Sequence, residues 1–197
     1  MPATPMLILA STSPYRRQLL ARLRLPFDVE APEVDETAAP GEHPPELALR
    51  LAQAKARAVA RRHPDAVVIG SDQVADLDGV PIGKPGTHER AAAQLRSMSG
   101  RRVVFQTGVC VVTSHFEDSG LVPVTVLFRT LSDADIERYL RLEQPYDCAG
   151  SAKVETLGIA LLDAVQTDDP TALVGLPLIQ TCRMLRRAGL DPLGAAS

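Results

Sequence analysis

The chain has 197 residues, 45% hydrophobic and 23% charged, which is ordinary for a globular protein with one sizeable core. A net charge of −3 and the absence of tryptophan argue against a nucleic-acid surface. Three widely spaced cysteines match no metal-binding pattern and indicate a cytoplasmic protein. We expect neither a signal peptide nor a membrane span, and one domain over residues 1–197 with 193–197 as a frayed tail.

Strands and helices alternate in the first part of the chain. The pattern predicts a buried strand over Met6–Ala10 and a helix from Pro14 to about Arg24, capped by Ser13. A short strand over Phe27–Glu30 is followed by an acidic, proline-rich loop over Ala31–Pro45. The loop leads into a helix that ends near residue 62, and a second buried strand follows over residues 66–70.

The second half favours antiparallel hairpins. Asp78-Gly79 indicates a tight turn, and long β-branched strands are expected over residues 101–114 and 121–130. Thr87 and Ser132 are expected to cap two further helices. A strand over residues 158–165 and a helix over 177–188 complete the set. The order favours an α/β fold with a mixed central sheet flanked by helices.

The first candidate site follows the first strand. Ser11, Thr12 and Ser13 open a helix that also carries Arg16 and Arg17. Backbone N–H groups at a helix start attract anions, and guanidinium groups match phosphate oxygens. A serine cap with two surface arginines is the simpler alternative.

The second candidate site follows the second buried strand. Asp72 comes directly after it, where a carboxylate is well placed to hold a metal or activate water. A carboxylate is a weak base at neutral pH, so a divalent metal is attractive there. An aspartate that only forms a turn is the alternative.

Two lysines add positive charge. Lys55 lies roughly 140° around its helix from the stripe of Arg50, Arg57 and Arg61, on the apolar side. A buried ammonium needs an anionic partner, either substrate phosphate or a loop carboxylate such as Glu33 or Asp35. Lys84 lies in a rigid Gly/Pro turn, in "IGKPG". Anion donors, one acidic group and lysines together imply metal-assisted hydrolysis of a small phosphate-bearing substrate.

Several ordered motifs then match a known family. The segments "LILASTSPYRRQLL", "APEVDET", "VVIGSDQV" and "CAGSAKVETLGIAL" resemble the Maf family of nucleotide pyrophosphatases, and the resemblance runs from about Leu7 to Leu193. It implies an elongated, Maf/ITPase-like single domain with a substrate cleft. It also implies a cytoplasmic enzyme, often dimeric, that cleaves nucleoside triphosphates to the monophosphate and pyrophosphate with Mg²⁺ or Mn²⁺.

The resemblance also assigns roles to residues. Asp72 matches the proton acceptor, supported by Glu33, Lys55 and Lys84, with Asp72 and Glu33 as candidate metal ligands. The phosphate-binding positions match Ser11, Ser13, Arg16 and Arg17. The substrate would be a small nucleotide, with no nucleic acid or membrane partner and with a homodimer as an option.

Three further positions are expected to set the base specificity. Tyr15, Gln73 and Glu155 resemble the branch that hydrolyses 7-methyl-GTP, although Tyr15 stands where that branch is expected to have tryptophan. Glu155 could accept from guanine N1–H and N2–H, and Tyr15 could offer its face to the cationic base. The alternatives are a dTTP/UTP/CTP pyrophosphatase of the sister branch and a nucleotide-responsive protein that inhibits septum formation.

Overall fold

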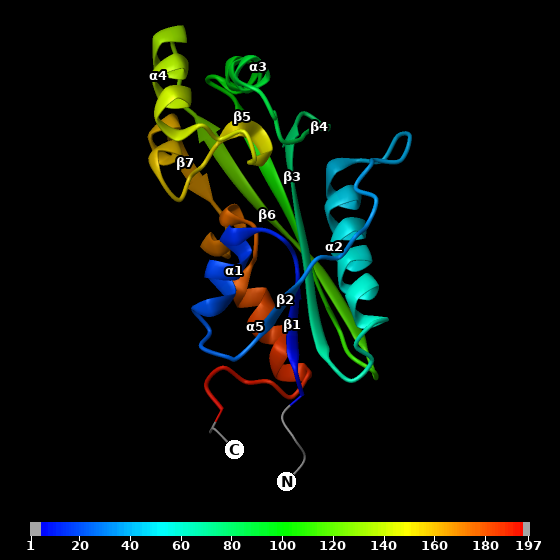
Figure 1. The fold of residues 1–197 in the computed structure, drawn as a ribbon. Coiled ribbons are helices and arrows are strands. Elements are labelled where there is room, and N and C mark those ends of the chain that lie inside the picture. Colours follow the sequence, from blue (N-terminus) through cyan, green and yellow to red (C-terminus); the bar gives the residue numbers. More distant parts are fainter. Residues whose placement is uncertain (1–4, 195–197) are drawn as a thin grey trace.

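A computed structural model describes residues 5–194 and contains a seven-stranded mixed sheet (Figure 1). The order is β2-β1-β3-β5-β6-β7, and β4 pairs with the outer half of β3. β1 runs parallel to β2 and β3, and all other pairs are antiparallel. The strands are β1 (Leu7–Ala10), β2 (Asp28–Glu30), β3 (Val67–Leu77), β4 (Val80–Ile82), β5 (Arg102–Val112), β6 (Glu117–Phe128) and β7 (Leu162–Gln166).

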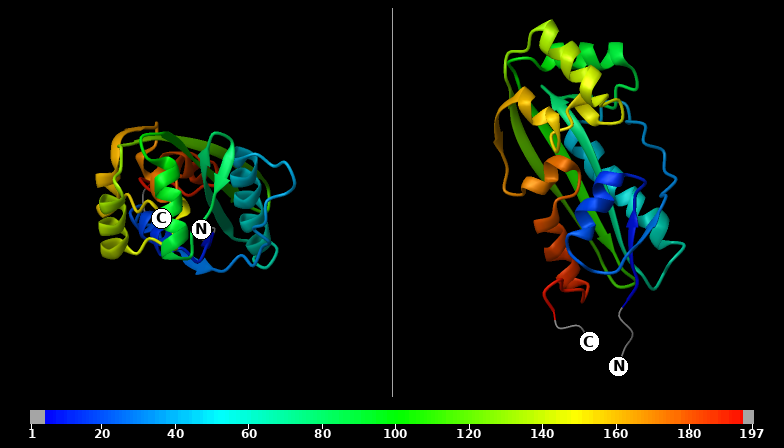
Figure 2. Two further views of the ribbon diagram at one scale, coloured as in Figure 1. Left: turned by 90° about the horizontal axis from the view of Figure 1, so that it is seen from above. Right: turned by 60° about the vertical axis from the view of Figure 1, so that its left-hand side comes forward.

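Helices cover both faces of the sheet along its length, giving an elongated molecule (Figure 2). They are α1 (Pro14–Ala21), α2 (Pro44–Ala60), α3 (His88–Met98), α4 (Asp133–Glu143) and α5 (Leu178–Arg187), with 3₁₀ turns η1 (Ala149–Ser151), η2 (Leu157–Leu161) and η3 (Pro170–Val174). α2 lies on one face and α1 and α5 on the other, while α3 and α4 pack together at the far end (Figures 1 and 2). The expected mixed α/β architecture is confirmed.

Side chains of β1 explain why both faces are covered. Leu7 and Leu9 join the core beneath α1 and α5, whereas Ile8 and Ala10 join the core beneath α2. This is the period-two alternation of a strand whose two faces are both buried. A third core under α3 and α4 includes Phe105 and the other large side chains of that end.

The second buried strand is much longer than the sequence indicated. The pattern predicted an end at Gly70, but β3 continues to Leu77 because β5 pairs with it from Val68 to Asp76. Its parallel partner β1 stops at Ala10, opposite Gly70. Asp72 therefore lies within β3, just beyond the end of its shorter neighbour.

Other element boundaries also differ from the sequence prediction. α1 ends at Ala21 rather than near Arg24, whose φ of 57° is incompatible with a helix. β6 begins at Glu117, earlier than expected, because its register with β5 extends to Val112. The predicted strand over 158–165 is a 3₁₀ turn up to Leu161 and only then a strand.

The predicted caps and turn are confirmed. The side chains of Ser13, Thr87 and Ser132 each accept a backbone N–H in the first turn of α1, α3 and α4. Asp78 and Gly79 both have positive φ, as a tight hairpin turn requires. Of the expected frayed tail 193–197, Leu193 is exposed, and residues 195–197 lie outside the described residues.

Glycine allows α2 to lie directly on the sheet. A Cβ built on Gly70 would come within 2.2 Å of the Ala52 carbonyl oxygen and 2.5 Å of the Ala56 nitrogen. Gly108 on β5 meets the Ala48 carbonyl oxygen at 2.5 Å in the same way. These obstacles are helix backbone, so α2 can approach this closely only where the strands lack side chains.

We predict that Gly70→Ala lowers the free energy of unfolding by roughly 1–3 kcal/mol, because the added methyl group overpacks a contact that cannot yield. Chemical denaturation measures the loss. Gly120→Ala on β6 is the matched control, since its new Cβ would meet only flexible side-chain ends, those of Gln180 at 3.2 Å and Met184 at 3.5 Å. Equal stability of the two variants would contradict the packing argument.

Candidate active site

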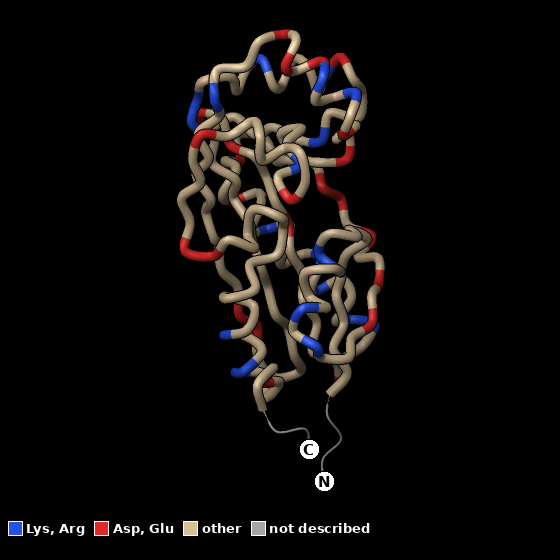
Figure 3. Tube along the Cα trace, turned by 90° about the vertical axis from the view of Figure 1, so that its left-hand side faces the viewer, with Lys and Arg blue, Asp and Glu red and all other residues tan. Residues whose placement is uncertain are grey.

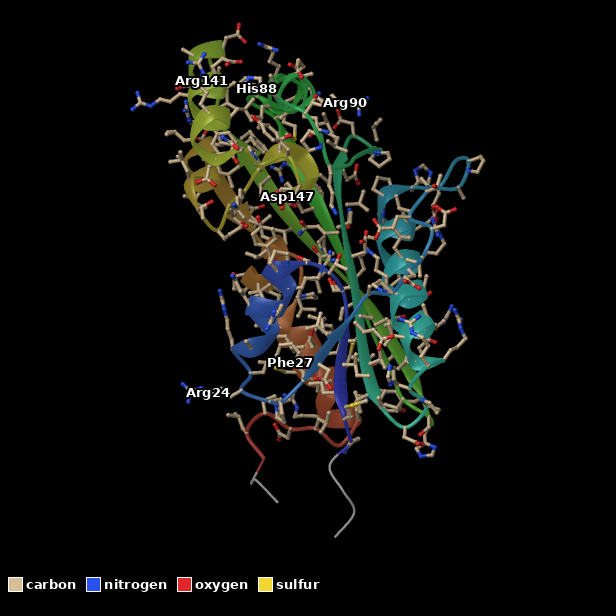
Figure 4. The ribbon with its side chains drawn as sticks, in the orientation of Figure 1. Arg24, Phe27, His88, Arg90, Arg141 and Asp147 are labelled. Carbon is tan, nitrogen blue, oxygen red and sulfur yellow. The ribbon has the colours of Figure 1, made fainter. Side chains whose placement is uncertain are left out.

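A cleft of about 680 Å³ opens beside the middle of β3. Its walls come from segments far apart in sequence: residues 11–16, 31–36, one side of α2, 72–74, 81–84, 147–155 and 173–175. Asp147, on the segment between α4 and η1, lies near the middle of the molecule in Figure 4. Arg24 and Phe27, by contrast, lie toward the end that carries the termini.

Lys55 and Asp72 form a buried ion pair at this cleft. Lys55 Nζ lies 2.6 Å from Asp72 Oδ1 and also 2.6 Å from Glu36 Oε1. The two paired residues are 5% and 8% exposed, whereas the side chain of Glu36 remains 54% exposed. One ammonium group therefore joins the carboxylate of β3 to the acidic loop.

The partner of Lys55 corrects one expectation and supplies a residue that was missed. The prediction that Lys55 is buried is confirmed, but neither Glu33 nor Asp35 pairs with it. Glu36 does, and the sequence held only a weak signal, because three acidic residues fall within four positions. Burial alone would raise the pKa of Glu36, but the Lys55 hydrogen bond and nearby cations lower it.

Arg16 lies beside the ion pair, whereas Arg17 does not. Arg16 donates from Nε to the Gly175 carbonyl at 2.8 Å, and its Nη2 is 4.0 Å from Asp72 Oδ1. Burial lowers the pKa of Arg16, and the Asp72 and Glu36 carboxylates partly offset this effect. Arg17 is exposed and lines a neighbouring groove between α1 and β2, which shares Thr12, Ser13 and Pro14 with the cleft but does not include Asp72.

The two serines shape the start of α1. Ser13 N–H donates to Ser11 Oγ at 3.1 Å, and Ser13 Oγ accepts from the Arg16 backbone N–H at 3.4 Å. Both residues line the cleft. Their oxygens accept within the loop, which leaves the hydroxyl protons as donors for an anion.

Tyr15 and Glu155 lie toward another part of the cleft wall, near Asp147. The Lys153 ammonium lies 5.6 Å from the centre of the Tyr15 ring. Burial raises the pKa of Tyr15, and burial also raises the pKa of Glu155, with Asp147 contributing to both shifts. This end of the cleft combines an aromatic ring with the carboxylates of Asp147 and Glu155, and the Lys153 ammonium lies beside the ring.

Gln73 is held by the backbone that faces it. Its Nε2 donates to the carbonyls of Ala172 at 2.8 Å and Leu173 at 3.1 Å, and lies 3.1 Å from Thr107 Oγ1. These contacts fix the amide orientation. Among the described residues nothing donates to Gln73 Oε1, so the side chain retains an acceptor and no spare donor.

Glu33 and Lys84 both line the cleft and are exposed. Glu33 has a φ of 48°, in the left-handed region that favours glycine. Within residues 5–194 neither side chain forms an ion pair, so both keep their charge available to a ligand.

The lining of the cleft carries more negative than positive side chains. Three cationic side chains (Arg16, Lys55 and Lys84) face five carboxylates (Glu33, Glu36, Asp72, Asp147 and Glu155). Elsewhere both signs are mixed along the chain rather than separated (Figure 3). A triphosphate would add further negative charge here, so its binding favours an accompanying cation.

The oxygen atoms available in the cleft fit a divalent cation whose remaining ligands come from the substrate. No group of three His, Cys, Asp or Glu side chains in the described part of the chain could hold a metal alone. Mg²⁺, however, usually takes one or two carboxylates plus substrate phosphates. Lys55 engages one oxygen each of Asp72 and Glu36, and nothing described donates to Asp72 Oδ2. Glu36 shares the Lys55 ammonium with Asp72 and so joins Glu33 as a carboxylate that could help to hold such a cation.

The three cysteines are free. Cys110 is buried in the core, and burial raises its pKa to about 12. Cys182 is only half-buried, and Cys148 lines the cleft, where burial raises its pKa to about 12. In residues 5–194 no helix has the length and apolar character of a membrane span.

Two relatives with similar sequences share one name. The chain is 68% identical over 191 residues to the 7-methyl-GTP pyrophosphatase of Polaromonas sp., covering 96% of this chain and 87% of that protein. It is 60% identical over 194 residues to the 7-methyl-GTP pyrophosphatase of Bordetella pertussis, covering 98% of both. The Staphylococcus aureus Ham1 structure is 18% identical with a TM-score of 0.44, over 65% of this chain and 72% of that one, which is too weak to establish kinship.

A family model described as "Maf-like protein" matches residues 6–188, which include every segment of the cleft wall. The match and the high identity to full-length relatives agree with the resemblance seen in the motifs. The chain belongs to the Maf family.

Proposed function

We propose that the protein hydrolyses 7-methyl-GTP to 7-methyl-GMP and pyrophosphate. The observation that carries the proposal is the distribution of side chains within one cleft. The cations Arg16 and Lys55 lie at one part of it, and Tyr15 and Glu155 lie at another. The first pair suits phosphates, and the second suits a cationic purine. The name carried by the relatives supports the same substrate.

The base would be read by its positive charge and its N–H groups. Methylation at N7 makes guanine cationic, so the acidic surroundings of Glu155 and Asp147 favour it over plain guanine. The Glu155 carboxylate can accept from N1–H and N2–H together, and these bonds are stronger from a cationic base. The Tyr15 ring would add a cation–π contribution of about 0.5–2 kcal/mol.

The phosphates would lie against Arg16, Lys55, Lys84 and the hydroxyls of Ser11 and Ser13. A water would attack the α-phosphorus, and the bond from that phosphorus to the bridging oxygen would break, releasing pyrophosphate. Asp72 Oδ2 would take the proton from the water or help to hold a divalent cation. Asp72 Oδ1 would remain oriented by Lys55.

A divalent cation such as Mg²⁺ or Mn²⁺, held by Asp72 and Glu36 with the phosphates, would neutralise charge on the triphosphate. Glu33 would stay at the cleft rim as a further acidic group. A cytoplasmic location and a homodimer remain predictions from the family resemblance.

The pyrimidine-specific branch is the second candidate. Glu155 counts against it, because a thymine or uracil edge offers one N–H between two carbonyl acceptors, which a carboxylate would repel. Gln73 also presents an acceptor, its Oε1 atom, which the carbonyl oxygens of a thymine or uracil edge would repel. A nucleotide-responsive binding protein would need no carboxylate poised at the phosphates, so catalysis ranks first.

The proposal is tested by pyrophosphate release from 7-methyl-GTP, GTP, dTTP, UTP and CTP with Mg²⁺ or Mn²⁺. We expect 7-methyl-GTP to be preferred, turnover to stop with EDTA, and Asp72→Asn to lose most activity, about 10²-fold or more. A preference for pyrimidine nucleotides would overturn the assigned substrate. Binding without pyrophosphate release from any nucleotide would overturn the enzymatic proposal.

The role of Glu155 is tested by Glu155→Gln. The amide has one acceptor and adds a donor, so we expect the ratio of kcat/KM for 7-methyl-GTP over GTP to fall about tenfold, equivalent to about 1.4 kcal/mol. Turnover of GTP itself should change less, because the phosphate contacts remain. An unchanged ratio would remove Glu155 from base recognition.

A further inference from the structure

Residues 31–42, the acidic loop that carries Glu36, form neither helix nor strand. One side chain of α2 ties this loop to the helix. Arg50 donates from Nε to Glu42 Oε1 at 2.5 Å and from Nη2 to Glu42 Oε2 at 2.8 Å. The same Nη2 donates to the Thr37 carbonyl oxygen at 3.0 Å. Arg50 thus donates hydrogen bonds to both ends of the turn formed by residues Thr37–Glu42.

Glu42 is more buried and has more hydrogen-bond partners than a solvated loop carboxylate would. Its side chain is only 9% exposed, and Oε2 also accepts from the Ala39 backbone N–H at 2.9 Å. The hydrogen bond from Arg50 and that from Ala39 lower the pKa of Glu42 to about 2. The Arg50–Glu42 pair therefore stays ionised at neutral pH. Glu42 is held in the turn both by Arg50 and by the Ala39 backbone.

Glu36 directly precedes Thr37, whose carbonyl oxygen accepts the hydrogen bond from Arg50. Its side chain is more than half exposed and has Lys55 as its hydrogen-bonding partner among the described residues. The Lys55 ammonium attracts the Glu36 carboxylate, but this attraction alone does not place the loop backbone. The backbone next to Glu36 is held by Asp35 Oδ1, which accepts from the Thr37 N–H at 2.9 Å, and by Arg50. The anchored Thr37 carbonyl limits where the backbone of Glu36 can lie and so directs the carboxylate to Lys55.

We propose that Arg50 is a positioning residue for hydrolysis, which acts through the Thr37–Glu42 turn to hold Glu36 against Lys55 and thereby beside Asp72. The inference rests on the proposed function. Arg50 does not line the cleft, so its effect on turnover would pass through the loop rather than through contact with the nucleotide.

The same helix supplies a matched control. Arg57, two turns farther along α2, makes an equivalent bidentate pair with Glu117 at 2.8 and 2.6 Å and is about half exposed. That pair joins α2 to β6 and does not touch the acidic loop. If Arg50 served only as a surface ion pair, the two arginines would matter equally and little.

The test compares Arg50→Ala with Arg57→Ala in turnover of 7-methyl-GTP. A misplaced reacting group costs up to about 10²-fold, so we expect Arg50→Ala to lose about tenfold to a hundredfold in kcat/KM. Arg57→Ala should remain close to wild type. In a Glu36→Gln background, Arg50→Ala should cause no further loss, because the group it positions is already gone. Equal effects of the two arginine variants, or fully additive losses, would overturn the proposal.

A second readout needs no turnover. The carboxyl ¹³C signal of Glu36, assigned with Glu36→Gln, reports its pKa, which Lys55, Lys84 and Arg16 lower in the wild type. We expect Arg50→Ala and Glu42→Gln each to move that pKa up towards its ordinary value, since the carboxylate leaves Lys55. An unchanged titration in folded variants would refute the positioning role. A wild-type protein inactive on every nucleotide would refute the proposed function, while the titration would still decide the role of Arg50.

Discussion

A lysine buried at the side of a cleft is the constraint on which the site depends. Burying an ammonium without a partner costs several kcal/mol, so Lys55 requires the carboxylate that β3 presents at Asp72. The Lys55 ammonium binds one oxygen of Asp72 and also binds the Glu36 carboxylate of the acidic loop. The arrangement holds the Asp72 carboxylate in place before any ligand arrives, which is the preorganisation that the proposed hydrolysis would need.

The sheet explains why this ion pair faces a cleft rather than the core. β3 has two partners along its first residues, but β1 stops opposite Gly70 while β5 continues to pair with β3. β4 pairs with β3 again only from Ala75 to Leu77, so this side of β3 is open between β1 and β4. Asp72 is the second residue past the end of β1 and lies in that opening. The 3₁₀ segment η3 closes part of the gap, tied to the sheet through Gln73 and Thr107.

Local chemistry made much of this fold predictable. Serine and threonine caps, the Asp78-Gly79 turn and the apolar position of Lys55 depend on neighbours in sequence, and all three are confirmed. The length of β3 and the 3₁₀ form of residues 157–161 depend on partner strands, which no local pattern encodes. Glu36 was missed for the same reason, because a loop reaches Lys55 only through tertiary anchoring.

In the proposed complex, one cleft holds the triphosphate at Arg16 and Lys55 and the methylated base at Tyr15 and Glu155. The most direct measurement is a crystal structure of the Asp72→Asn variant with 7-methyl-GTP and Mg²⁺. We expect the guanine edge to lie on the Glu155 carboxylate and the phosphates to lie along Arg16, Lys55 and Lys84. A nucleotide bound the other way round, or in the groove beside Arg17, would contradict it.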